Sequence, residues 1–400
     1  MQQTITKIPT GYKQTELGVI PEDWEINKLS NVAPLQRGFD LPTSQLRKGP
    51  FPVVYSNGIL NFHDKAMAKA PGVVTGRSGT IGKVNYIEKE YWPHNTTLWV
   101  TDFKGNDEKY VYFLYSHIKI ERFRTGSGVP TLNRNDVHEF KVSIPKSKTE
   151  QTAIATVLSD TDALIERLEK LIAKKKAIKQ GAMQQLLTGK KRLPGFSGEW
   201  EVKKLREIGE LAGAGIDKKS KPDEVPVRLV NYLDVFRNDF IYSKDLNHWV
   251  TAPTAQAQRC AVKRGDVFFT PSSEMRWDIG ISAVAMEDIP DAGYSYHVDR
   301  LRLFDDWDLV FRTYIFKTKN FLDQAETICE GSGKRYVISL TKFREMTVKY
   351  PVDKTEQTAI ATILFDMDAD IESLEQKRNK YIMLKQGMMQ QLLTGKIRLN

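Results

Sequence analysis

Two segments of the chain are copies of one another. Residues 149–193 and 355–399 align without a gap at an offset of 206 residues, and 30 of the 45 aligned positions are identical. A weaker echo stands ahead of each long intervening segment, where Trp24 is followed by a glutamate just as Trp200 is. A duplicated frame that carries two dissimilar inserts predicts two different globular heads on one scaffold.

Each copy carries the pattern of one long helix. Seam residues recur in steps of three and four from Leu158 to Ile172, and matching positions run from Leu364 to Tyr381. This narrow stripe is typical of a coiled coil, and a helix over 150–188 would be about 57 Å long. The sequence therefore predicts two long antiparallel helices that form a coiled coil between two globular heads, with pseudo-two-fold symmetry.

The heads are predicted to belong to the α+β or α/β class. Short strand-like runs such as 97–100 and 266–269 are broken by Gly, Pro and Asn turns, and helical stretches such as 109–120 follow them. The expected divisions are the first head with its N-terminal frame segment, the first helical region, the second head and the second helical region. Their bounds are 1–148, 149–193, 194–354 and 355–400.

Charged side chains interrupt both seams where apolar residues are due. They are Lys175, Lys179, Arg378 and Lys385. Two interpretations stay open: the stems cover apolar surface while the charges reach solvent, or a partner or DNA approaches a polar mid-section. A second apolar patch near each helix end could be core or could face a partner. Its residues are Met183, Leu186, Leu187, Met389, Leu392 and Leu393.

The charge of the chain favours a polyanionic partner. The net charge is +9, which is typical of many nucleic-acid-binding proteins. Residues 24–148 carry 18 basic and 11 acidic side chains, whereas residues 200–354 carry 24 of each. The first head is therefore the more basic, and the second head must concentrate its positive charge locally if it binds nucleic acid.

Polar, glycine-rich loops are the best candidates for DNA contact. Glycine lets backbone N–H groups approach phosphates, and Arg, Lys, Asn and Ser supply donors for phosphates and base edges. In the first head the candidates are Arg77, Ser78, Lys83, His94, Asn95, Ser127, Asn133 and Arg134. In the second head they are Lys218, Lys219, Ser272, Ser273, Arg276, Ser332, Lys334, Arg335 and Tyr336.

The sequence matches no known motif for catalysis or for cofactor binding. The run from Gly76 to Lys83 resembles a P-loop, but five residues separate Gly76 from Gly82 and a valine follows the lysine. The two cysteines lie far apart, and no HExxH, CxxC or NPP-aromatic pattern occurs. We expect no catalytic residues, no metal and no cofactor. The helix acids Asp160, Asp162, Asp366 and Asp368 are interpreted as solvated surface groups.

The repeated frame and the N-terminal segment resemble a known family. The run from Gly18 to Glu25, both copies of TEQTAIA…KQGxMQQLLTGKxRL, and the first-head segments GRSGTIGKV and GSGVPTLNRNDV are similar to specificity subunits of type I restriction-modification systems. RGDVFFTPSS and SGKRYVISLTKF in the second head are similar too, less sharply. The resemblance covers essentially the whole chain.

The resemblance implies a function and a set of partners. The heads would be target recognition domains, each reading one half of a gapped duplex DNA site, and the helices would set the spacing. Two methyltransferase subunits would dock on the repeats, with the helix-end patches as candidate contacts, and restriction subunits would join the complex. No apolar run approaches the roughly 18 residues of a membrane span, and the N-terminus lacks an apolar signal core. We therefore expect the protein to lie in the cytoplasm.

Three other hypotheses stay open at this point. The chain could be the recognition subunit of a gapped-site system in which methyltransferase and nuclease are fused. It could be a structural adaptor that does not read DNA, against which the basic first head and its loops argue. A stand-alone enzyme would need motifs that the sequence lacks.

The first prediction concerns the chain ends. Residues 1–25 supply the frame segment that the second repeat lacks on its C-terminal side, so we expect the two ends to lie close together. A circular permutant that joins Asn400 to the N-terminus by a short linker should fold, as measured by circular dichroism and thermal unfolding. Loss of folding in this permutant would contradict the pseudo-symmetric scaffold.

Overall fold

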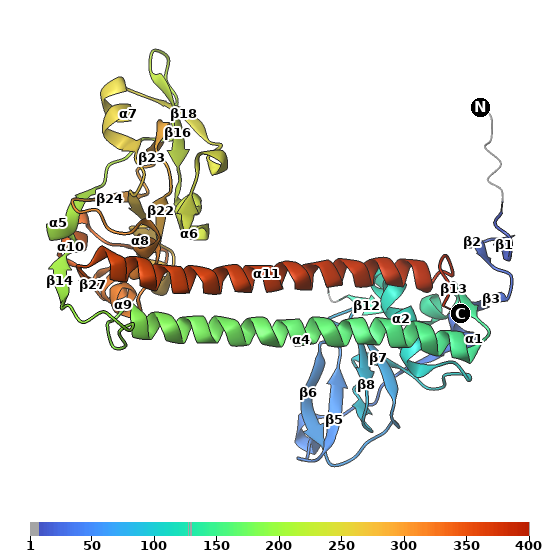
Figure 1. Cartoon of the computed structure of the whole chain (residues 1–400). Helices are drawn as coiled ribbons and strands as arrows, with labels where there is room; N and C mark the ends of the chain where they lie inside the picture. Colours follow the sequence, from blue (N-terminus) through green and yellow to red (C-terminus); the bar gives the residue numbers. More distant parts are fainter. Residues whose placement is uncertain (1–7, 127, 129, 400) are drawn as a thin grey trace, which may run out of the picture. The chain divides into compact units, whose positions relative to one another are not determined.

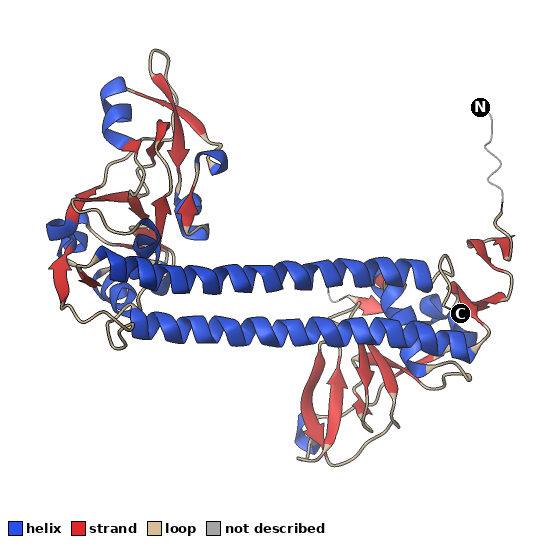
Figure 2. Ribbon diagram, in the orientation of Figure 1, coloured by secondary structure: helices blue, strands red, loops and turns tan. Residues whose placement is uncertain are grey.

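The computed structural model describes residues 8–126, 128 and 130–399, and it divides into two compact units (Figure 1). Unit 1 comprises Met1–Lys170 and Glu375–Asn400, and unit 2 comprises Leu171–Leu374. Each unit therefore holds one head together with a part of both long helices. In Figure 2 the strands gather in the heads.

The two predicted long helices are present. Helix α4 is Lys148–Leu186 and helix α11 is Lys354–Leu392, each 39 residues long; Figure 1 draws them in green and red. Buried seam positions recur along α4 at Leu158, Leu168 and Ile172. Each helix begins one residue before the start of its predicted helical region.

Ion pairs between the helices show that they pack antiparallel within each unit. In unit 2, Lys179 Nζ lies 2.5 Å from Asp368 and Lys175 Nζ lies 2.6 Å from Asp370, so the residue number rises on one helix as it falls on the other. The lysines thus bind carboxylates of the opposite helix.

Unit 1 contains the corresponding pair, Lys385 and Asp162, at 2.6 Å. Neither sequence interpretation of the seam lysines included these partners, which the structure adds for Lys175, Lys179 and Lys385. Asp162 and Asp368 remain partly exposed acids of the helix surface, and each pairs with a lysine of the opposite helix.

The head of unit 1 is built on a sheet with strand order β4-β10-β7-β8 and a smaller one with order β6-β5-β9. Asp107 caps the start of helix α2, and its side chain accepts from the N–H of Tyr110 at 2.8 Å. The strands are β1 (Tyr12–Thr15), β2 (Gly18–Pro21), β3 (Trp24–Lys28), β4 (Leu35–Arg37), β5 (Phe51–Tyr55), β6 (Gly58–His63), β7 (Gly72–Gly76), β8 (Val84–Ile87), β9 (Trp92–Pro93), β10 (Thr97–Val100), β11 (Arg124–Thr125), β12 (Thr131–Leu132) and β13 (Lys141–Pro145). The helices are α1 (Leu29–Val32), η1 (Thr43–Gln45), α2 (Glu108–His117), η2 (Ile120–Phe123) and α3 (Arg134–His138).

The head of unit 2 has a sheet with order β15-β24-β20-β22-β17 and a second one with order β18-β16-β23-β19. The strands are β14 (Trp200–Lys204), β15 (Gly209–Ala212), β16 (Val225–Val230), β17 (Phe240–Ile241), β18 (Trp249–Ala252), β19 (Ala261–Val262), β20 (Val267–Phe269), β21 (Ser272–Ser273), β22 (Ser282–Ala285), β23 (Ile289–Tyr294), β24 (Asp299–Leu303), β25 (Glu330–Ser332), β26 (Arg335–Val337) and β27 (Thr347–Pro351). The helices are α5 (Leu205–Ile208), α6 (Tyr232–Arg237), η3 (Ser243–Asp245), α7 (Thr254–Cys260), η4 (Arg276–Asp278), α8 (Leu309–Ile315), α9 (Lys319–Ile328) and α10 (Leu340–Glu345). Helices and strands mix in both heads, as predicted.

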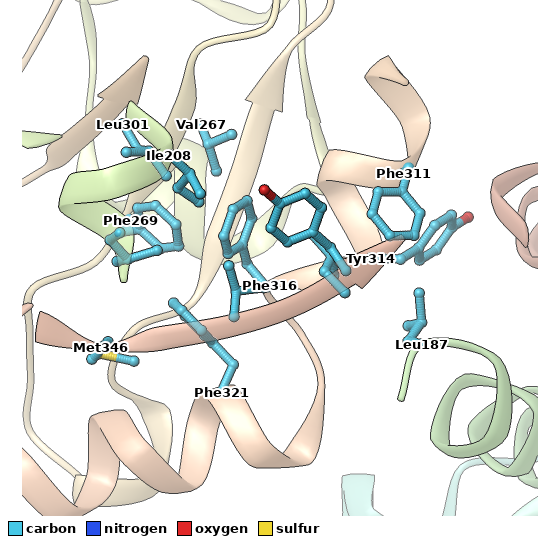
Figure 3. Packing of buried hydrophobic residues seen from close by; sticks show 14 of the residues in the cluster. Leu187, Ile208, Val267, Phe269, Leu301, Phe311, Tyr314, Phe316, Phe321 and Met346 are labelled. Atoms are coloured by element: carbon cyan, nitrogen blue, oxygen red, sulfur yellow. The ribbon is translucent and has the colours of Figure 1, made fainter. Parts of the chain in front are cut away.

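The leucines of the helix-end patches lie inside the units. Leu186 and Leu187 are buried in the aromatic core of unit 2, where Figure 3 shows Leu187 near Phe311 and Tyr314. Leu392 and Leu393 are buried in the core of unit 1. Side chains this deeply buried cannot face a partner, so the structure corrects their assignment to a docking surface. Met183 and Met389 pack at the edges of these cores and are partly exposed.

A buried glutamate joins the two copies of the repeat in each unit. In unit 1, Glu150 at the start of α4 accepts from Nε and Nη2 of Arg398 at 2.9 and 2.7 Å, and Trp24 Nε1 donates to it at 3.4 Å. In unit 2, Glu356 at the start of α11 accepts from Arg192 at 2.6 and 2.7 Å and from Trp200 at 3.4 Å. We call each of these trios a Trp–Glu–Arg clamp.

The glutamine that follows this glutamate makes the same hydrogen bonds in both units. Gln151 donates to the carbonyl of Pro145 at 2.9 Å and accepts from the N–H of Asp107 at 2.8 Å. Gln357 makes the same pair of bonds in unit 2, to Pro351 and from Asp308, both at 2.8 Å. These bonds tie each long helix to the strand before it and to a helix of its own head. The clamp and these bonds account for the glutamate and the glutamine that are identical in the two copies.

The described ends of the chain meet in unit 1. Arg398 lies 2.7 Å from Asp23, and the hydroxyl of Tyr12 donates to the carbonyl of Lys396 at 3.5 Å. This is the proximity that the permutant requires.

The clamps generate a prediction about stability. Glu150 and Glu356 are 6% and 2% exposed, and removal of one partner of a buried ion pair leaves the other charge uncompensated. We expect Glu150→Ala and Glu356→Ala each to lower the free energy of unfolding of their unit by about 3 kcal/mol. Thermal and denaturant unfolding measure this loss.

The matched control is Glu169→Ala, which removes an exposed glutamate of α4 and should change stability by less than about 0.5 kcal/mol. A clamp variant as stable as this control would show that the clamps do not hold the units together.

Candidate nucleic-acid interface

The first head has a groove of about 680 Å³ that collects three of the predicted DNA-contact residues, Arg77, Asn133 and Arg134. We call it the first-head groove. Its lining residues are Gln36, Arg37, Gly38, Phe39, Arg77, Leu98, Thr125, Thr131, Leu132, Asn133 and Arg134. Among the residues that the structure describes, three arginines and no carboxylate line this surface.

Two of the predicted loops meet to build the first-head groove. Ser78 pairs with Thr131 in an isolated β-bridge, so the glycine-rich loop after β7 lies against the β11–β12 hairpin. Gly76 is required there, because a Cβ at this position would lie 1.8 Å from the carbonyl oxygen of Thr80. Asn133 caps α3 by accepting from the N–H of Asn135 at 3.1 Å.

The second head has a groove of about 550 Å³, which we call the second-head groove. It collects Ser272 and Arg335 from the predicted set, and Asp299 lies within it. An adjoining hollow of about 460 Å³ shares Ser272, His297 and Arg335 with it and adds Ser273 and Lys334. The loops that carry these residues form a small sheet with order β21-β26-β25.

Backbone hydrogen bonds show that the two grooves occupy equivalent places in their heads. The N–H of Leu132 donates to the carbonyl of Arg77 at 2.8 Å, and the N–H of Ile338 donates to the carbonyl of Pro271 at 2.8 Å. Leu132 and Ile338 are 206 residues apart, which is the offset of the repeat. Arg77 of the first head therefore corresponds to Pro271 of the second.

The strand register gives a second correspondence. Thr75 lies opposite Leu98 in the β7–β10 pair, and Phe269 lies opposite Asp299 in the β20–β24 pair. Thr75 lies two positions before Arg77, and Phe269 lies two positions before Pro271, its equivalent. The place of Leu98 in the first-head groove is therefore taken by Asp299 in the second.

The remaining two arginines also have counterparts. Arg37 lies opposite Leu98, and Gly213 borders Asp299, because a Cβ on Gly213 would lie 3.0 Å from Asp299 Oδ1. Arg134 is the first residue of α3, as Leu340 is of α10. Gly213, Pro271 and Leu340 thus stand where the first head has arginines.

The second-head groove contains a buried acid. Asp299 is 7% exposed, and burial raises its pKa to about 7, opposed by the charge of Arg344. Burial also lowers the pKa of His297, as do the nearby charges of Lys218 and Arg335. The grooves are thus alike in construction and unlike in chemistry.

Other predicted contacts already have partners within the head. The ring of His94 packs against that of Tyr55 in a tilted arrangement with 4.4 Å between ring centroids, and burial lowers the pKa of His94. Asn95 donates to Asp40, and Lys83 donates to the carbonyl of Asn57 at 3.1 Å. The structure does not bring Lys83, His94 and Asn95 into the first-head groove.

In the second head, Arg276 lies over the ring of Tyr336 at 5.4 Å and donates to the carbonyl of Cys329 at 2.9 Å. Lys218, Lys219 and Ser332 are exposed. Ser127 lies outside the described residues.

The sequence interpretation missed residues that the folded sheets supply. Gln36 and Arg37 come from β4, and Asp299 comes from β24. The glycine after Arg37 was a usable signal, because a Cβ on Gly38 would lie 2.2 Å from the carbonyl oxygen of His94. Asp299 gave no such signal, since its burial depends on strand pairing.

Within residues 8–126, 128 and 130–399, no cluster of three His, Cys, Asp or Glu side chains could hold a metal ion. No helix in the same ranges is long and apolar enough to cross a membrane.

The raised pKa of Asp299 predicts a pH-dependent effect of its removal. Folding favours the protonated acid, so Asp299 costs stability increasingly as pH rises from its ordinary value of 3.8 to about 7. Asparagine cannot ionise, so Asp299→Asn should raise the Tm relative to the parent more at pH 8 than at pH 5. An equal difference at both pH values would contradict the burial of an ionisable acid.

Comparison with known proteins identifies the family. A family model described as the type I restriction modification DNA specificity domain matches residues 21–180 and 197–382. The MjaVIII specificity subunit of a type I restriction enzyme from Methanocaldococcus jannaschii is 25% identical over 307 residues, 72% of this chain and 70% of that protein. The MjaIX specificity subunit of the same organism is 24% identical over 187 residues, 40% of this chain and 43% of that protein.

Solved structures share the fold. A crystal structure of a type I restriction-modification S subunit from M. genitalium matches with a TM-score of 0.60 at 15% identity, and the match covers 97% of this chain and 98% of that one. A chain from a structure on complex assembly and conformational transition of the type I R-M system matches at 0.56, with 13% identity and coverage of 94% and 99%. Since the family model spans both heads and most of both long helices, this chain belongs to the type I restriction-modification DNA specificity family.

Proposed function

We propose that the chain is the DNA-reading subunit of a type I restriction-modification complex and has no catalytic chemistry of its own. Each head reads one half of a bipartite, gapped duplex target, and the two long helices set the spacing between the halves. Two methyltransferase subunits dock on the chain, restriction subunits join through the complex, and the assembly works in the cytoplasm without a cofactor bound to this subunit.

The observation that carries this proposal is the pair of equivalent grooves with unlike linings. A duplicated frame places one groove in each head, and Arg37, Arg77 and Arg134 in the first are replaced by other residue types in the second. A protein that needed two identical sites would keep the same lining in both. Different linings on one construction suit two different DNA sequences.

The charge distribution supports the same proposal. Basic residues exceed acidic ones by seven in residues 24–148 and balance them in residues 200–354. Nonspecific attraction to the phosphate backbone therefore acts mainly on the first head. The second head must gain its selectivity from local contacts.

We propose that the methyltransferase contacts include the exposed parts of Met183 and Met389. In unit 2 a groove of about 340 Å³ runs beside Met183 and is bordered by Trp277, which is 66% exposed. Exposed tryptophan and methionine are enriched at protein interfaces. Leu186 and Leu187 are buried in the core of the same unit and do not line this groove.

The experiment that tests the function selects bound sequences from random duplex DNA, using the full chain in complex with the methyltransferase encoded beside it. We expect a motif with two short fixed blocks separated by a gap of undetermined sequence. One contiguous block would mean that one head reads DNA, and no enrichment from an intact complex would favour a structural adaptor. Nuclease activity of the methyltransferase partner would identify the fused gapped-site system instead.

A further inference from the structure

We propose that the two equivalent grooves divide the work of DNA binding: the first-head groove holds backbone phosphates through Arg77 and Arg134, and the second-head groove does not hold phosphate. This inference rests on the proposed function, because it assumes that both heads face DNA. It adds which chemical part of the DNA each groove takes.

Arg77 is held in place by its backbone. Its N–H donates to the carbonyl of Thr96 at 2.8 Å, and its own carbonyl accepts from Leu132 at 2.8 Å. The preceding Gly76 turns so tightly against Thr80 that no side chain fits there. The point at which the Arg77 side chain leaves the backbone is therefore fixed before any ligand binds, so the backbone loses little further freedom on contact.

The guanidinium groups of Arg77 and Arg134 have no hydrogen-bond or ion-pair partner among the described residues. Arg37 differs, since its Nη2 lies 3.0 Å from Asp40. No described residue that lines the first-head groove is acidic. Two unneutralised arginines in an acid-free groove are complementary to a group that carries negative charge and several acceptor oxygens.

The shape of the site favours phosphate over a base edge. Base edges lie inside the grooves of the duplex and are read by protruding elements, whereas the phosphates form the outer ridges of DNA. Arg77 is partly buried in a concave surface and Arg134 is exposed at the start of α3. A phosphate ridge can enter such a concavity without deformation of the base pairs.

The second-head groove has lost these features. At the places of Arg37, Arg77 and Arg134 stand Gly213, Pro271 and Leu340. The buried acid Asp299 replaces a leucine beside them. A carboxylate that faces the groove repels a phosphate when it is ionised.

The cations that remain in the second-head groove are already engaged. Arg344 donates to the carbonyl of Leu211 at 3.0 Å, and Arg335 donates to Ser272 Oγ at 3.4 Å. Glu210 is a further acid of the lining. We therefore expect this groove either to contact base edges or to make no contact with DNA.

The test measures how the binding constant for duplex DNA depends on salt, using the full chain in complex with its methyltransferase. Each phosphate neutralised on B-DNA contributes about 0.9 to the slope of log binding constant against log salt concentration. We expect the double variant R77A/R134A to lower the slope by about 1.8 and to leave the selected motif unchanged.

Two comparisons control for general charge and for the second head. K48A/K89A removes two exposed lysines of the first head that lie outside the groove, and its slope should match the parent. Arg335→Ala should also leave the slope unchanged. Circular dichroism of every variant confirms that the fold is retained.

Three results would overturn the proposal. The slope of R77A/R134A could equal that of K48A/K89A, the selected motif could change at one base position, or Arg335→Ala could lower the slope by about 0.9. These outcomes are separable from failure of the proposed function, because the slope is also measured on nonspecific duplex. Absence of a gapped motif in the parent complex would contradict the proposed function, and the slopes of the variants could still be compared.

Discussion

Each unit depends on a buried glutamate that is neutralised by an arginine from the opposite copy of the repeat. Glu150 opens α4 and is bound by Arg398, which follows α11, while Glu356 opens α11 and is bound by Arg192, which follows α4. A buried carboxylate without such a partner is strongly destabilising. Neither copy of the repeat can therefore complete a unit by itself. Each copy of the repeat supplies the arginine that neutralises the buried glutamate at the start of the other copy's helix.

The heads vary within this fixed frame. The clamp, the glutamine bonds and the paired strands β3–β13 and β14–β27 recur in both units, so the frame leaves the intervening chain free to change. The grooves show how far that change has gone: their backbone construction is shared, yet one is lined by arginines and the other holds a buried aspartate. A scaffold that keeps geometry while the lining changes suits a pair of DNA readers with different targets.

Much of the frame could be predicted from the sequence, because duplication and seam periodicity are local signals. Helices over 148–186 and 354–392 follow from steps of three and four. The burial of Leu186 and Leu392 could not be predicted, since apolar residues at a helix end look the same whether their own head or a partner covers them. The partners of the seam lysines could not be predicted, because these carboxylates lie about 190 to 220 residues away along the chain.

The grooves were only partly predictable for the same reason. Arg77, Asn133 and Arg134 stand in polar, glycine-rich segments that sequence marks as loops, and they meet in one place. Arg37 and Asp299 enter through strand pairing, which a single sequence does not specify. The correspondence of Leu98 with Asp299 has no trace in residue identity and appears only in the register of the sheets.

We propose that each head reads its own part of the target. The most direct test places a photo-crosslinking amino acid at Asn135 in one variant and at Thr341 in another, which are exposed and equivalent positions of α3 and α10. Each variant is bound with its methyltransferase to the selected duplex, and the crosslinked nucleotides are mapped. We predict crosslinks to two different blocks on either side of the gap. Crosslinks from both positions to one block, or from the first head alone, would contradict it.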